Sequence, residues 1–205
     1  RIVTPKEFRN KLDTLSSEMN SILKSRFDAL KTANKKEKTE IQKICQLIVF
    51  FENRLPINVI ETLKFSKNSI VILEKSLVVT ENAYGEISFF HDNYFRYFLE
   101  KEDYSLFSKT DFKKISKFIK QMKPIYGNRI MVNYAKCLFY LGQIEEFLEI
   151  SEKLLEELLC ESMPIEVDSL ARFYVKHING EKYKNQRLKF MIESAYTQME
   201  LQSFE

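Results

Sequence analysis

The sequence has 205 residues, of which 44% are hydrophobic, and this is enough for one large or two small domains with buried cores. Its four glycines and four prolines are few, which favours helices over a β-sandwich or barrel. The 32 basic and 29 acidic residues are mixed along the chain, so the net charge of +3 gives little support to nucleic-acid binding. The longest apolar runs are far shorter than the roughly 20 residues of a membrane span, and no membrane partner is expected.

The cysteines indicate the compartment. Cys45, Cys137 and Cys160 are an odd number of widely spaced residues, and each lies within an apolar helical pattern. We therefore predict buried, reduced thiols and a cytoplasmic location. No signal peptide is visible, and the chain begins at Arg1 without a methionine, so we expect a piece of a longer protein.

The N-terminal part predicts two helices and a break. Thr4 is a suitable N-cap and Pro5 suits the first helical position, so a helix is expected over residues 4–15. Apolar spacing predicts a second helix over 17–32. The polar stretch 31–38 is interpreted as a linker and a subdomain boundary, and its basic residues as a solvated loop rather than a nucleic-acid site.

Three further helices follow. Residues 39–52 have a wide apolar face and predict a central, nearly surrounded helix. A short helix is expected over 56–64, after the helix-ending residue before Pro56. Ser66 or Asn68 then caps a third helix, which continues to residue 75.

Residues 77–90 are the one stretch in which the apolar pattern changes from a helical period to a period of two. Strands are predicted over 77–80 and 86–90, with Asn82 and Gly85 as turn formers between them. Three helices followed by a two-stranded hairpin form the element order of a winged helix.

His91 is the candidate site residue of this hairpin. Strand alternation places it on the side of Ile87 and Phe89, at the inner edge of the hairpin, with Asp92 as cap of the next helix. The simplest interpretation is a structural histidine that is hydrogen-bonded to backbone. Alternatively, the positive helix end disfavours the imidazolium and leaves a neutral ring that can donate one N–H to a phosphate. The aromatic helix after it is expected to bury Phe95, Phe98 and Leu99.

After residue 102 the pattern is helical throughout. A helix over 111–122 is expected to end at Pro124 and Gly127. Two helical pairs follow, and they are predicted over 128–141 with 145–159 and over 165–178 with 182–201. The spacing of the two turn glycines is close to the roughly 34-residue period of tetratricopeptide (TPR) repeats. We interpret these pairs as TPR-like hairpins and expect more of them after Glu205.

Catalytic motifs are missing from the sequence. It contains no GxxxxGK[ST], GxGxxG, CxxC or GxSxG pattern. A metal site at His91 and Asp92 would need further ligands, and the one other histidine, His177, lies in a predicted hairpin helix. In a winged helix the third helix usually contacts the DNA bases. Here that helix is mostly apolar and has few polar residues, which disfavours DNA binding. We expect no catalytic and no metal-binding residue in this chain.

Three stretches carry a resemblance to a known family. They are KSRFDAL at 24–30, ISFFHD at 87–92 and YFRYFL at 94–99. In this order, with hairpins after them, they resemble the module downstream of the nucleotide-binding core in STAND-class NTPases. This class of signalling ATPases includes NOD-like receptors, apoptotic ATPases and bacterial antiviral defence proteins. The Walker A and B core itself is absent from the sequence.

The resemblance implies a mainly α fold with three parts. These are a lid-like helical segment (1–34), a winged-helix domain with one β-hairpin (35–102) and a TPR-like helical repeat segment (103–205). By resemblance, His91 would approach the β-phosphate of ADP and Pro5 would lie near the adenine. The ADP or ATP, with Mg²⁺ in the parent protein, would be contacted only marginally by this segment. The parent protein is expected to be an ATPase.

The function implied is that of a regulatory segment. The winged helix would stabilise the ADP-bound inactive state against the nucleotide-binding core of the same polypeptide. The repeats would receive a protein trigger, with homo-oligomer formation on activation. Bacterial antiviral defence is one setting that the resemblance implies. Two alternatives stay open, namely a protein-interaction scaffold without a nucleotide role and a winged-helix nucleic-acid-binding regulator.

Overall fold

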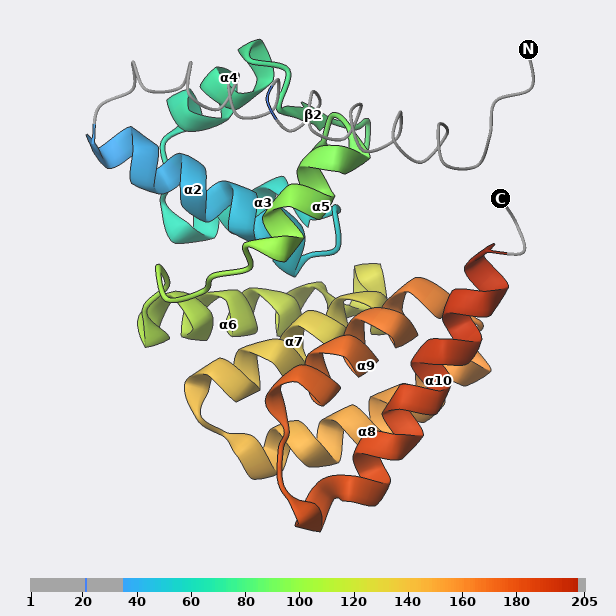
Figure 1. The fold of residues 1–205 in the computed structure, drawn as a ribbon. Helices are drawn as coiled ribbons and strands as arrows, with labels where there is room; N and C mark the ends of the chain where they lie inside the picture. Colours follow the sequence, from blue (N-terminus) through green and yellow to red (C-terminus); the bar gives the residue numbers. More distant parts are fainter. Residues whose placement is uncertain (1–20, 22–34, 203–205) are drawn as a thin grey trace, which may run out of the picture. The chain divides into compact units, whose positions relative to one another are not determined.

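The computed structural model describes Ser21 and residues 35–202. Pro5 and the predicted helix 4–15 lie outside these residues, as does the predicted helix 17–32 apart from Ser21. The described chain is mainly helical with a small antiparallel sheet (Figure 1), which confirms the predicted fold class. It forms two compact units, Arg1–Leu106 and Phe107–Glu205.

Unit 1 has the element order of a winged helix. Its elements are α2 (Lys35–Phe50), β1 (Leu55–Pro56), α3 (Ile57–Leu63), α4 (Lys67–Lys75), β2 (Val79–Glu81), β3 (Glu86–Phe89) and α5 (Asp92–Glu100). The strands pair in the order β1-β3-β2, with Leu55 opposite Ile87 and Thr80 opposite Ser88. The sequence predicted the hairpin but not β1, because a two-residue strand has no period to detect.

The first described helix, α2, begins earlier than expected. It includes residues 35–38, so this half of the predicted linker is wrong. Lysine and glutamate are good helix formers, and the Thr39 hydroxyl donates to the Lys35 carbonyl at 3.1 Å. The prediction of a central helix is confirmed, because α2 buries every residue from Ile44 to Phe50.

Polar side chains of α2 and of the turn after it bind distant backbone. Gln46 donates to the Lys101 carbonyl at 3.3 Å and accepts from the Asp103 N–H at 3.2 Å. Asn53 Oδ1 accepts from the Phe89 N–H at 2.7 Å. These contacts attach the end of α5 and strand β3 to the central helix.

Helix α5 covers the inner face of β3 with aromatic rings. Tyr94 and Phe98 are buried and stack on Phe89, with centroid distances of 6.3 and 5.3 Å. Of the predicted inner face, Phe98 is confirmed, whereas Phe95 and Leu99 are only half-buried and Tyr94 is buried in their place. Tyr94 and Phe98 are one helical turn apart, so both can face the sheet and stack on Phe89.

Unit 2 is a succession of helices. They are α6 (Lys109–Tyr126), α7 (Asn128–Leu141), α8 (Ile144–Cys160), α9 (Pro164–His177), a 3-10 turn (Glu181–Tyr183) and α10 (Lys184–Gln202). Both predicted helical pairs are confirmed, α7 with α8 and α9 with α10. Pro124 lies inside α6 and does not end it; Gly127 does, at a φ of 61°. A proline in the last turn costs the helix only one backbone hydrogen bond.

The core of unit 2 is aromatic. Tyr174 of α9 stacks on Phe190 of α10 at 4.0 Å and on Phe147 of α8 at 5.8 Å. Helix α9 packs on α7 as well as on α8 and α10. Burial also confirms two thiol predictions and corrects the third, since Cys45 and Cys137 are buried while Cys160 is exposed. Desolvation raises the pKa of both buried thiols well above the usual range.

Candidate functional site

The structure places His91 at the N-cap of α5. Its Nδ1 accepts a hydrogen bond from the Asn93 backbone N–H at 3.2 Å, and the side chain is exposed. The predicted position at the inner edge of the hairpin is wrong, and so is the predicted cap, because Asp92 is the first residue of the helix. Strand β3 ends at Phe89 and its ladder stops at the Phe90 N–H, which donates to the Val78 carbonyl.

The capping contact sets the roles of the two ring nitrogens. Nδ1 accepts the hydrogen bond from the Asn93 N–H, which leaves Nε2 as the ring nitrogen that can meet a ligand. This hydrogen bond to backbone confirms the structural interpretation of His91. The side chain lies at the N-terminal end of a helix, where anions are favoured. The contact with phosphate stays a prediction, and Pro5, the other predicted nucleotide-binding residue, lies outside the described residues.

The surroundings of His91 are mixed in character. Phe90 and Leu77 are large exposed apolar side chains beside it, because residue 90 pairs with Val78. Asp92, in the first turn of α5, is exposed and brings a negative charge close to the ring. An anion bound here would be attracted by one ring N–H and repelled by one neighbouring carboxylate, so its binding would be weak.

Helix α4 has the place that a DNA-reading helix takes in a winged-helix domain. Acidic side chains of α2 lie at its N-terminus. Glu40 Oε2 accepts from the Ser66 N–H at 3.0 Å and from the Ser69 hydroxyl at 2.9 Å. Glu37 accepts from the Asn68 amide at 2.8 Å. These carboxylates occupy the positive helix end and would repel a phosphate backbone.

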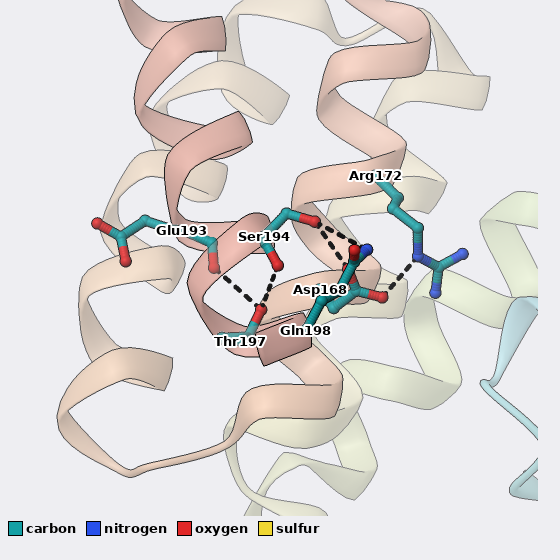
Figure 2. Close-up of polar contacts among 6 residues, drawn as sticks. All are labelled: Asp168, Arg172, Glu193, Ser194, Thr197 and Gln198. Atoms are coloured by element: carbon teal, nitrogen blue, oxygen red, sulfur yellow. Dashed lines mark hydrogen bonds and ion pairs between the residues drawn. The ribbon is translucent and has the colours of Figure 1, made fainter. Parts of the chain in front are cut away.

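In unit 2 a polar cluster joins α9 to α10, as Figure 2 shows. Asp168 accepts from Arg172 Nε at 2.7 Å through one oxygen. Its other oxygen accepts from the Ser194 hydroxyl at 2.8 Å and from the Gln198 amide at 3.0 Å. A helix-internal contact completes the cluster, since the buried Thr197 hydroxyl lies 3.0 Å from the carbonyl oxygens of Glu193 and Ser194. The carboxylate thus fixes the register of the two helices.

Beside this cluster an open groove of about 360 Å³ runs between the two helices. Its lining residues come equally from α9 and α10, and they are Ala171, Arg172, Val175, Lys176, Met191, Ser194, Ala195 and Gln198. Both charged side chains among them, Arg172 and Lys176, are positive. We call this feature the α9–α10 groove.

The surface of α10 next to the groove is apolar. Five large side chains at helical spacing are between 44% and 67% exposed, namely Leu188, Met191, Ile192, Tyr196 and Met199. We call them the α10 stripe. They lie on the side of the helix opposite Phe190 and Thr197, which face the core. Helix α10 is therefore apolar on two sides, and only one of them is covered within the described residues.

His177 belongs to the aromatic core. Its ring lies 4.4 Å from the Phe173 centroid and 4.8 Å from that of Phe139. Over the described ranges, no three His, Cys, Asp or Glu side chains gather as a metal site requires. Among the helices of residues 35–202, none has the length and apolar composition to span a bilayer.

Sequence reasoning did not identify the α9–α10 groove. The exposed apolar residues at 188, 191, 192, 196 and 199 were a detectable signal, but helical spacing alone does not distinguish a covered face from an exposed one. Models of known protein families, curated proteins and solved structures were all compared with this chain, and none of them matches.

Proposed function

We propose that this chain is a regulatory segment of a STAND-class signalling ATPase. In this proposal the winged-helix unit stabilises the ADP-bound, inactive state and the helical hairpins receive a protein trigger. The partner of unit 1 is the nucleotide-binding core of the same cytoplasmic polypeptide, which would bind ATP or ADP with Mg²⁺ and oligomerise on activation. Bacterial antiviral defence is the proposed setting.

One observation carries the proposal. A winged-helix unit that presents an exposed histidine at a helix N-terminus is followed in the same chain by helical hairpins. This combination supports a switch unit joined to a sensor, as in the class that the sequence resembles.

The proposed contact is a single charge-assisted hydrogen bond. His91 Nε2–H donates to a β-phosphate oxygen of ADP, and the N-terminus of α5 adds favourable electrostatics. A hydrogen bond to a charged group contributes about 1.5–3 kcal/mol, or roughly 10- to 150-fold in ADP affinity. Because the Asp92 carboxylate repels the phosphate, we expect a contribution near the lower end of this free-energy range. A trigger bound to the hairpins can release the inactive state only if it binds the active form more tightly than the inactive one.

The test replaces His91 in the parent protein with residues that keep the cap. Serine and aspartate are both good N-caps, so His91→Ser and His91→Asp should fold like the wild type. His91→Ser removes the ring donor and should speed ADP release about 10-fold. His91→Asp adds a repelling charge and should speed it further. Circular dichroism checks the fold, and a fluorescent ADP analogue reports the release rate.

A control variant separates this effect from general damage to the hairpin. Tyr84→Ser changes a side chain that is 86% exposed in the hairpin turn and should leave ADP release unchanged. If His91→Asp folds normally and retains ADP as the wild type does, the nucleotide role of His91 is wrong.

A protein-interaction scaffold without a nucleotide role is the second candidate. The observation that favours it is the α10 stripe, because an exposed apolar patch of this kind indicates a binding surface. A scaffold predicts that all three variants behave alike in the ADP assay.

A further inference from the structure

Two helices of unit 2 carry opposite charge. Helix α6 has six lysines and a single acid, Asp111, whereas α8 has six glutamates and a single lysine, Lys153. Both minority charges have partners within their own helix or its cap. Asp111 accepts from the Ser108 N–H at 3.0 Å, and Lys153 lies 3.7 Å from Glu157. The surface of α6 is therefore basic and that of α8 is acidic.

Three lysines of α6 follow one another along one exposed face. They are Lys109, Lys113 and Lys117, and we call them the α6 lysine stripe. Residues four apart on a helix are neighbours, about 6 Å from one another along the axis. Within the part of the chain that the structure describes, none of these three ammonium groups has an ion pair or a side-chain hydrogen bond. Their charges are available to another molecule.

Three glutamates of α8 form the corresponding acidic feature. Glu145 and Glu149 are exposed and Glu152 is half-buried, and we call them the α8 glutamate stripe. Among residues 35–202, no cation pairs with any of the three. Their positions lie about 0, 6 and 10.5 Å along the axis, against about 0, 6 and 12 Å for the lysines. The flexible lysine side chain can span this small difference.

The two charged helices approach one another at Tyr134 of α7. Lys120 Nζ of α6 lies 4.7 Å from the centroid of this ring, and the Tyr134 hydroxyl donates to Glu146 of α8 at 3.2 Å. A purely anionic partner that reached the lysines would therefore also come near the acidic helix, which would repel it. A partner that carries both charges would be attracted by both helices. This chain itself has such a surface.

We propose that unit 2 associates with a second copy of this chain, in which the α6 lysine stripe of one copy pairs with the α8 glutamate stripe of the other. The matched spacing allows each lysine to meet one glutamate with both helices straight. Exposed ion pairs are individually weak, so the association is reversible and depends on low ionic strength.

The inference rests on the charges of α6 and α8 and not on the role proposed for His91. It needs neither a nucleotide nor the nucleotide-binding core, and it is separate from oligomerisation of the parent protein on activation. Because it can be tested with this chain alone, either proposal can fail without the other.

The first test is the salt dependence of self-association. Sedimentation velocity over a range of protein concentrations should show a reversible increase in mass at about 20 mM NaCl. Raising the salt to about 500 mM should weaken the association at least 10-fold, because exposed charges are then screened over a few ångströms. Hydrophobic association would not be weakened by salt in this way.

Charge reversal locates the two surfaces. One variant combines Lys113→Glu with Lys117→Glu, and the other combines Glu145→Lys with Glu149→Lys. Each should weaken self-association at least 10-fold, because like charges then face one another. All four positions are exposed and lysine and glutamate are both good helix formers, so circular dichroism should show an unchanged fold.

Mixing the two variants is the decisive experiment. The reversed stripe of each variant complements the unchanged stripe of opposite charge on the other, so an equimolar mixture should associate although each variant alone does not. A merely structural effect of the substitutions would not be reversed by mixing.

A matched control separates the stripes from net charge. Lys67→Glu with Lys75→Glu makes the same change in net charge at two exposed positions of α4 in unit 1. This variant should associate within about twofold of the wild type, since charges beyond a Debye length are largely screened.

Several results would overturn the proposal. One is a wild-type chain that stays monomeric at low salt up to its highest soluble concentration, and another is a variant mixture that stays monomeric. A third is a monomeric chain that binds single-stranded RNA or anionic vesicles through Lys113 and Lys117, since the partner would then carry phosphates.

Discussion

The two units are stabilised in different ways. In unit 1, side chains bind backbone far away in the sequence, as Gln46 does at Lys101 and Asn53 at Phe89. In unit 2 each helix packs mainly on the next, and the ring stack of Phe147, Tyr174 and Phe190 follows that succession. The first arrangement is closed around the C-terminal part of its central helix, where every residue from Ile44 to Phe50 is buried. The second resembles a repeat array, in which a terminal hairpin keeps one face for a further element.

The largest expected effect tests the succession in unit 2. Phe190→Ala removes a fully buried ring that stacks on Tyr174 and should lower the free energy of unfolding by about 3–5 kcal/mol. Because contacts are local, amides of α10 should lose hydrogen-exchange protection first, before those of α7. Equal loss of protection throughout unit 2 would contradict this succession.

A smaller effect tests the long-range attachment in unit 1. Asn53 has a φ of 61° and accepts from the Phe89 N–H, so Asn53→Ala should cost about 2–4 kcal/mol in unfolding free energy. Asn53→Gly keeps the backbone conformation and loses only the hydrogen bond, so it should cost about 1–3 kcal/mol. Chemical denaturation measures both. If the two variants are equally stable, backbone strain contributes nothing at this position.

The smallest effect concerns the hydroxyl of Tyr174. Burial raises the pKa of Tyr174 from 10.0 to about 12. Between these values the unfolded chain binds fewer protons than the folded one, so the stability contributed below pH 10 is lost as the pH rises towards 12. Tyr174→Phe keeps the ring stack and lacks this ionisation. Its unfolding free energy should therefore fall less steeply over this range than that of the wild type, as urea titrations at each pH would measure.

The fold was predictable where the apolar periodicity extends over many residues. The helices of unit 2 have three or more turns, so a residue more or less at either end does not change the pattern. Strand β1 was missed because its two residues are too few to show any period. Cys160 fits an apolar pattern yet lies exposed in the last turn of α8. Local pattern does not report what covers a helix end.

The candidate sites were less predictable than the fold. At His91 the predicted helix start was correct to within one residue, but that residue decides between the inner edge of a sheet and an exposed cap. The α9–α10 groove depends on which face of α10 is covered, and this follows from the position of α9 rather than from α10 itself. Both results depend on contacts between elements, which periodicity within one element does not contain.

The two-residue strand β1 has a consequence for the solubility of the chain. It forms one edge of the sheet, and Pro56 within it has no backbone N–H to offer to a further strand. At the other edge, β2 is three residues long and ends in the exposed carboxylate of Glu81. Short, proline-containing and charged edges resist pairing with strands of other molecules. Unit 1 is thereby protected from edge-to-edge aggregation, and any partner of its sheet must bind through side chains.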